Sequence, residues 1–205
     1  MNAKIAITGL PKTGKTLLAL SLSNLTGIPY VQNKTMYEWY RLFNLTYNVG
    51  LDWNDLFLIA VSSFLERVDT ESHYEQFISD GASFSELLWL KMNIEKQAGN
   101  GLQRERNQME ESLERISAAY AARRYDFVVH TKHPVHDASS DDIYIQLFRK
   151  YNISYKIYDT AQIEKTLQAI TRDMELPVIS TVKRSIFKAK RMIFKKEMKP
   201  FKLRL

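Results

Sequence analysis

The sequence predicts a three-layer α/β/α fold with a parallel five-stranded sheet, followed by a basic C-terminal helical tail. Five short apolar segments alternate with longer segments of helical periodicity; they are 5–7, 28–31, 74–79, 125–131 and 154–158. A glycine-rich loop that leads into a helix follows the first apolar segment. The 205 residues, of which 45% are hydrophobic, are enough for one sizeable domain with a packed core.

Apolar spacing and turn residues place the expected helices at 16–26, 36–43, 53–68, 84–96, 103–122, 141–150 and 160–174. Thr26-Gly27 is expected to end the first of them, and the polar stretch Asp69-Thr70-Glu71-Ser72 is expected to end the third. Because strands alternate with helices, we expect parallel strands with helices on both faces of the sheet.

The loop after the first strand has the spacing of a phosphate-binding P-loop (Walker A motif), Gly-x-x-x-x-Gly-Lys-Thr, between a strand and a helix. Glycines permit a close backbone approach, so that consecutive N–H groups and the helix N-terminus can face a polyphosphate. Lys15 is expected to reach the β- and γ-phosphates, and the Thr16 hydroxyl is expected to bind Mg²⁺. The predicted nucleotide-binding residues are Gly9, Leu10, Pro11, Lys12, Thr13, Gly14, Lys15, Thr16 and Leu17.

Asp80 is the second candidate, at the end of the third predicted strand. If that strand neighbours the first, the carboxylate lies beside the P-loop. There it can hold Mg²⁺ through water or accept a proton from an acceptor hydroxyl. The alternative is an ordinary turn aspartate, since Asp-Gly is a common loop signal.

Three segments of the chain, 5–16, 77–81 and 125–129 with the Pro134 loop after it, resemble nucleoside and nucleotide kinases of the P-loop class. They are most similar to small ATPase domains related to ribosylnicotinamide kinase. The resemblance implies ATP and Mg²⁺ as cofactors and a small phosphoryl acceptor bound between the second and third strands and the adjoining helices. It also implies that Lys12, Lys15 and Asp80 are catalytic, and that Thr16 and Asp80 hold the metal.

The resemblance further implies an acceptor region at residues 32–35, with Trp39 or Tyr37 as a stacking face. The same residues also fit a capped helix start followed by core aromatics. Gly81 follows Asp80 where several nucleotide kinases have an arginine. Binding of an acceptor monophosphate is therefore less strongly implied than binding of ATP.

Many such kinases carry arginines in a lid after the fourth strand, whereas residues 133–144 contain none. Lys12 occupies the position where some thymidylate kinases place a catalytic arginine, and it can supply the charge without a bidentate fork. The other candidate cations, which also fit a solvated helix face, are Arg104, Arg106, Arg123 and Arg124.

Two functions follow from these residues. The first is an ATP–Mg²⁺-dependent phosphotransferase (a kinase) that acts on a small nucleoside- or nucleotide-like acceptor. The second is a P-loop ATPase or NTP-binding switch that regulates a partner through the basic tail.

The net charge of +6 is unevenly distributed. Residues 183–205 hold ten Lys or Arg and one acid, which leaves 19 basic and 22 acidic side chains in the rest of the chain. We therefore expect a P-loop NTP-binding domain in 1–180 and a basic amphipathic tail in 181–205. Ile186-Phe187 and Ile193-Phe194 recur at seven residues, so the tail either docks on the domain through its phenylalanines or contacts nucleic acid, an anionic membrane or a protein. Self-association into a homo-oligomer is a further alternative.

The remaining signals concern compartment and metal. Absence of cysteine excludes disulfides and thiolate metal sites. Met1 leads almost at once into the first strand, so we expect no signal peptide. No apolar run reaches the ~20 residues of a membrane span. We therefore expect a cytoplasmic protein. His130, His133 and His136, with Asp137, fit either a zinc site or a polar loop.

Overall fold

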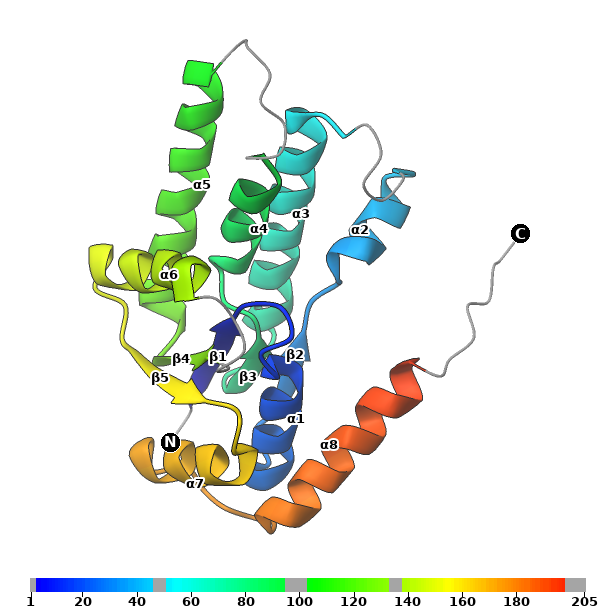
Figure 1. Ribbon diagram of the computed structural model, residues 1–205, viewed down its shortest axis with the longest axis vertical. Helices are drawn as coiled ribbons and strands as arrows, with labels where there is room; N and C mark the ends of the chain where they lie inside the picture. The colour runs from blue at the N-terminus through cyan, green and yellow to red at the C-terminus, as the bar shows by residue number, and fades with distance from the viewer. Residues whose placement is uncertain (1–2, 46–50, 95–102, 133–137, 198–205) are drawn as a thin grey trace.

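The computed structural model describes residues 3–45, 51–94, 103–132 and 138–197 (Figure 1). Its centre is a five-stranded parallel sheet in the order β2-β3-β1-β4-β5. The strands are β1 (Lys4–Gly9), β2 (Tyr30–Gln32), β3 (Phe77–Asp80), β4 (Phe127–Lys132) and β5 (Tyr155–Asp159). Each overlaps one of the predicted apolar segments, and the predicted α/β/α fold with a parallel five-stranded sheet is confirmed.

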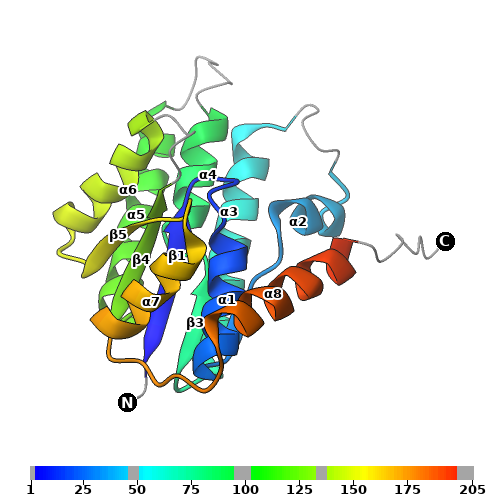
Figure 2. The ribbon, with the colours of Figure 1, turned by 60° about the horizontal axis from the view of Figure 1, so that its bottom comes forward.

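Helices cover both faces of this sheet (Figure 2). They are α1 (Lys15–Thr26), α2 (Met36–Leu42), α3 (Trp53–Ser72), α4 (Ser85–Ile94), α5 (Gln103–Arg124), α6 (Ala138–Lys150), α7 (Ile163–Asp173) and α8 (Val182–Glu197). Helices α2 to α6 pack on one face, and α1, α7 and α8 pack on the other. In the described part of the chain, none of these helices is both long and apolar enough to cross a bilayer.

Alternation along the strands divides the interior into two cores. In β1, Ile5 and Ile7 belong to the core under α1, α7 and α8, whereas Ala6 belongs to the core under α3 to α6. Successive side chains of a strand point to opposite faces, so a short run of apolar residues supplies both cores at once. Because β1 is also the central strand, the loop that follows it lies at the middle of the carboxyl edge of the sheet.

The predicted end of the third helix was wrong. The polar stretch 69–72 was expected to break it, but α3 continues to Ser72. The side chain of Glu71 is buried and accepts hydrogen bonds from Ser79 Oγ (2.6 Å) and Tyr120 Oη (2.9 Å). These partners come from β3 and α5, so tertiary contacts extend a helix that local polarity alone does not favour.

Glu114 of α5 connects this helix to α4 and to the end of α6. Its carboxylate, on α5, accepts from Lys91 Nζ on α4 (3.0 Å), Lys150 Nζ on α6 (2.6 Å) and the Tyr151 hydroxyl (2.9 Å). Burial alone would raise the pKa of Glu114, but the hydrogen bonds from Lys150, Lys91 and Tyr151 outweigh it, so the pKa lies below its ordinary value of 4.5.

Glu114→Gln is expected to lower the free energy of unfolding at pH 7 by about 1–2 kcal/mol, because charge-assisted hydrogen bonds are lost. A carboxyl whose pKa is lower in the folded state stabilises the fold above about pH 4.5 and loses that contribution as the pH falls through the folded pKa. Urea unfolding of wild type and variant at pH 7 and at about pH 3 should therefore show a difference that narrows on acidification. An equal difference at both pH values would contradict the role of the charge.

Candidate functional site

The P-loop begins where β1 ends, at a position that accepts only glycine. Gly9 has φ +144°, and a Cβ there would lie 2.3 Å from Thr131 Oγ1 and 2.5 Å from the Thr131 carbonyl oxygen. Gly14, at the N-cap of α1, has φ +82°. No side chain caps α1, and its first turn carries no acid. The first N–H groups of α1 are therefore available to an anion, which fits the phosphate of a nucleotide.

Hydrogen bonds to β4 and to the β5–α7 connection hold this loop in place. Thr13 is buried, and its Oγ1 donates to Leu10 O (2.8 Å) and lies 2.8 Å from Thr131 Oγ1. Thr131 Oγ1 in turn donates to Thr8 O (3.0 Å). From the other side, Thr160 Oγ1 donates to Thr13 O (2.6 Å). Two segments distant in sequence, β4 and the β5–α7 connection, thus fix the backbone of the P-loop.

The charged residues of the loop differ in exposure. Lys15 Nζ donates to Leu10 O (2.7 Å), so the ammonium group lies over the loop rather than out in solvent. Lys12 is exposed and has φ +64°, an uncommon angle for a residue with a side chain. Thr16 and Leu17 are half-buried in the first turn of α1. The structure thus gathers the predicted nucleotide-binding residues into one loop and one helix start.

Asp80 lies at the same edge of the sheet as the P-loop. It pairs with Ile7 across β3 and β1, and the N–H of Gly81 donates to Ile7 O (2.8 Å). One carboxylate oxygen, Oδ2, accepts a hydrogen bond from the Tyr30 hydroxyl (3.0 Å). Burial, together with the charge of Asp80, raises the pKa of Tyr30, so this phenol remains a donor at neutral pH. The third strand does neighbour the first, as the prediction of Asp80 beside the P-loop required.

Arg67 of α3 lies against the turn that follows Asp80. A Cβ on Gly81 would be 2.9 Å from Arg67 Nη2. Arg67 is buried and donates to Glu86 Oε1 (2.7 Å from Nη2) and to Ser79 Oγ (3.1 Å from Nη1). Gly81 itself has no side chain, and the structure brings the guanidinium of Arg67 against this turn from α3.

This arginine is embedded in a buried charge cluster. Burial alone would lower the pKa of Arg67, but the neighbouring carboxylates, first that of Glu86, outweigh it and raise the pKa. Burial raises the pKa of Glu71, against the opposing effects of Arg67 and of hydrogen bonds from Ser79, Tyr120 and Tyr125. The cluster holds α3, α4 and β3 together behind Asp80 and is a structural support of the site.

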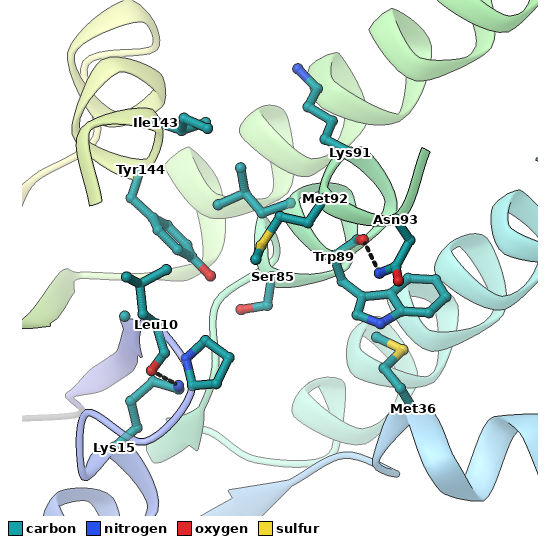
Figure 3. Close-up of a pocket in the computed structure, with 13 residues that line it drawn as sticks. Leu10, Lys15, Met36, Ser85, Trp89, Lys91, Met92, Asn93, Ile143 and Tyr144 are labelled. Atoms are coloured by element: carbon teal, nitrogen blue, oxygen red, sulfur yellow. Dashed lines mark hydrogen bonds between the residues drawn. The ribbon is translucent and has the colours of Figure 1, made fainter. Parts of the chain in front are cut away.

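A cavity of about 520 Å³ opens beside the P-loop, within the usual size range of small-molecule sites (Figure 3). Its walls come from the loop, from α4, from α6 and from the start of α2. The described lining residues are Gly9, Leu10, Pro11, Lys15, Met36, Ser85, Leu88, Trp89, Lys91, Met92, Asn93, Ile143 and Tyr144. Figure 3 shows Tyr144 pointing from α6 towards the loop and Ser85, and Trp89 lying between Asn93 and Met36. Most of the lining residues are apolar, and Lys15 lies where the cavity meets the P-loop.

Most of these lining residues were not predicted as site residues. In the sequence, Trp89 looks like one more core residue of an apolar helix. Residues 87–90 are four consecutive apolar residues, and such a run extends around most of a helix turn. Leu87 and Leu90 are fully buried in the core, whereas Trp89 and Met92 line the cavity. This run is the sequence signal that α4 has apolar side chains beyond the face that packs in the core.

Residues 32–35, the predicted acceptor region, lead from β2 into α2. The Thr35 side chain and Glu38 form a reciprocal capping box at the start of α2. Lys34 pairs with Glu66 and lies 5.2 Å from the Trp39 ring, which stacks on Phe43. The alternative interpretation, a capped helix start with packed aromatics, describes this segment. Met36, one residue further on, lines the cavity.

The candidate replacement arginines do not gather at the loop. Arg124 donates to Tyr74 O (2.8 Å) and to Glu71 O and lies 5.1 Å from the Phe77 ring, beside the start of β3 and β4 rather than their carboxyl ends. Arg104 and Arg123 are exposed, and Arg106 lies 5.8 Å from the Trp53 ring. The structure thus leaves Lys12 and Lys15 as the cations placed on the P-loop itself.

His130 is buried in β4, where its ring lies 5.3 Å from that of Tyr144. The other members of the predicted zinc group, His133, His136 and Asp137, lie outside the described residues. Within the described ranges, no three His, Cys, Asp or Glu side chains come together as a metal site.

No protein-family model and no curated protein matches the sequence. Solved structures do match. The chain is similar to deoxyadenosine kinase from M. mycoides with bound dCTP (TM-score 0.57, 12% identity, 84% of this chain and 98% of that one). The same enzyme with bound dATP gives a TM-score of 0.57 at 14% identity, over 84% of this chain and 99% of that one. NadR in complex with NR gives a TM-score of 0.62 at 12% identity, over 87% of this chain and 52% of that one, so the match spans about half of NadR. With its five-stranded parallel sheet and its loop after β1, the chain has the P-loop kinase-like fold.

Proposed function

We propose that this protein is an ATP–Mg²⁺-dependent phosphotransferase that acts on a small nucleoside-like acceptor. The observation that carries the proposal is the cavity of about 520 Å³ that begins at Lys15 of the P-loop and continues between α4 and α6. A kinase needs this arrangement, because the acceptor hydroxyl must approach the end of the bound triphosphate. The fold that the chain shares with deoxyadenosine kinase and NadR supports it.

The residues of the loop divide the work in this proposal. The N–H groups at the start of α1 bind phosphate, and Lys15 and Lys12 stabilise negative charge on the transferring phosphoryl group. Thr16 holds the metal. Asp80 acts either as an outer ligand of the metal or as the base for the acceptor hydroxyl. Mg²⁺ held by Thr16 would neutralise part of the charge of the bound phosphates. Tyr30 occupies Oδ2 of Asp80 and so orients that carboxylate.

The walls of the cavity indicate what the acceptor looks like. Trp89, Met92 and Met36 provide apolar and polarizable surface suited to a flat ring, and Asn93 and Tyr144 provide polar groups within it. A nucleoside combines a flat base with a hydroxyl-bearing sugar and fits this composition. A deoxynucleoside and ribosylnicotinamide both belong to this class.

The test is ADP release from ATP–Mg²⁺, alone and with a panel of nucleosides, nucleotides and ribosylnicotinamide. We expect one acceptor class to stimulate release. Lys12→Ala should lower kcat by about 10²-fold or more with little change in ATP affinity, because it removes charge from the phosphoryl group. Trp89→Ala should chiefly raise the KM of the acceptor. Lys165→Ala, which removes an exposed lysine from α7, serves as the control and should change neither.

Slow hydrolysis of ATP that no acceptor stimulates, and that Lys12→Ala leaves unchanged, would contradict the kinase proposal. That result would favour the other function, an ATPase or NTP-binding switch acting on a partner.

A further inference from the structure

Helix α8 contains two copies of a seven-residue unit. Residues 183–189 read Lys-Arg-Ser-Ile-Phe-Lys-Ala and residues 190–196 read Lys-Arg-Met-Ile-Phe-Lys-Lys. Seven residues are close to two helical turns, or about 10.5 Å, so equivalent members of the two units lie on the same side of the helix. The repeat therefore presents the same chemistry twice along one edge of the molecule.

The inner side of α8 is already occupied. Ser185, Ile186 and Ala189 are buried, and Ile186 belongs to the core that α8 shares with α1 and α7. Figures 1 and 2 both show α8 lying along α1 on the outside of the domain. Since the isoleucine of the first unit is buried against the domain, the helix is anchored, and its other side faces outward.

The outer side carries the two phenylalanines. Phe187 is 68% exposed and Phe194 is 61% exposed, which contradicts one of the two alternatives for the tail, that these rings pack on the domain. Helical geometry places Lys183 and Lys190 on one side of the line through the two rings, and Arg184 and Arg191 on the other. These cations are exposed, and residues 182–194 of α8 include no acid. Two aromatic rings thus project from a ridge between two rows of positive charge.

We propose that this outer face of α8, defined by Phe187, Phe194 and the four flanking cations, binds an anionic lipid bilayer surface. Lysine and arginine attract anionic headgroups, each strengthening binding roughly fivefold close to such a surface. The rings then enter the boundary between headgroups and acyl chains, while the long basic side chains stay at headgroup level. The charge of the ridge is complementary to the lipid, and its convex shape allows both rings to reach it together.

Other occupants fit this face less well. A second copy of the chain, related by a twofold axis, would bring rows of positive charge together. Single-stranded nucleic acid stacks successive bases on aromatic rings within a basic groove. The two rings here lie about 10.5 Å apart along the helix, which is too far for them to stack on neighbouring bases. The inference does not depend on the proposed kinase activity.

The experiment is co-sedimentation of the full-length protein with vesicles of phosphatidylcholine containing about 30% phosphatidylserine, a strongly anionic surface, and with pure phosphatidylcholine vesicles. We expect binding to the anionic vesicles and at least tenfold weaker binding to the neutral ones. F187S/F194S should weaken binding about tenfold or more, because the apolar contribution is lost. R184Q/R191Q should weaken it by a similar factor. Both variants should retain the wild-type melting temperature, since the altered side chains are exposed.

Two control variants remove matched side chains from the opposite side of the sheet. L58S/L65S removes two exposed leucines from α3, and R104Q/R115Q removes two exposed arginines from α5; both should bind as wild type does. The proposal is overturned by equal binding to both vesicle types, or by binding that F187S/F194S leaves unchanged. It is also overturned by phenylalanine-dependent dimerisation, or by phenylalanine-dependent binding of single-stranded nucleic acid that is tighter than binding to the vesicles.

Discussion

Replacing Arg67 with methionine is expected to lower the free energy of unfolding by about 3–5 kcal/mol, because it leaves buried carboxylates without their cation. Arg67 Nη2 lies 2.7 Å from Glu86 Oε1, and Nη1 lies 3.5 Å from Glu71 Oε1. All three side chains are buried. Urea unfolding at pH 7 measures the effect. It should decrease on acidification, because burial raises the pKa of Glu71 and this carboxyl then takes up a proton.

Two companion variants show whether the loss comes from buried charge. Arg67→Met combined with Glu71→Gln and Glu86→Gln should recover part of the lost stability, because the uncompensated charges are then gone. Arg115→Met breaks another i,i+4 pair, with Glu111, but on the exposed side of α5, and should cost less than about 0.5 kcal/mol. If Arg67→Met cost no more than Arg115→Met, the buried cluster would not be what holds α3, α4 and β3 together.

Gly9→Ala is expected to destabilise the fold by about 3 kcal/mol or more and to abolish stabilisation by ATP–Mg²⁺. The new Cβ would meet Thr131 Oγ1 at 2.3 Å and, more seriously, the Thr131 carbonyl oxygen at 2.5 Å. That carbonyl belongs to β4, whose pairing with β1 forms the centre of the sheet. The loop must therefore shift, and the N–H groups at the start of α1 shift with it. Thermal unfolding with and without nucleotide measures both effects.

Gly14→Ala is the matched variant, because it adds the same methyl group at a position where it makes only ordinary van der Waals contact. Its Cβ would have Thr160 at 3.8 Å as nearest neighbour, so only the angle φ +82° opposes it. The expected loss of stability is about 1 kcal/mol. Thr131→Ala should not rescue Gly9→Ala, since the carbonyl contact persists. Equal stability losses for the two glycine variants would show that backbone angle, and not the contact with β4, makes Gly9 necessary.

The fold and the loop could be predicted because both depend on local pattern. Alternating apolar strands and helices specify a parallel sheet covered on both faces, and the spacing from Gly9 to Thr16 specifies the turn between a strand and a helix. The errors arose where local polarity was opposed by distant partners. Glu71 was expected in a helix-breaking stretch, yet it lies in α3, because its carboxylate is paired with groups from β3 and α5.

The cavity beside the P-loop could not be predicted for the same reason. Trp89, Met92 and Tyr144 come from two helices that meet only when the sheet is assembled, and single-residue patterns do not show which face of an apolar helix meets a cavity. Arg67 reaches the turn at Gly81 from α3, a placement that depends on how α3 packs on β3.

The P-loop spacing from Gly9 to Thr16 and the positive charge at the C-terminal end can both be read directly from the sequence, because each is a property of contiguous residues. The packing of the helices on the sheet sets which side chains face the cavity beside Lys15, and which side of α8 faces outward. Ile186 is buried against the domain while Phe187, its neighbour in the chain, is exposed, because a helix turns by about 100° per residue and only one of its sides can contact α1.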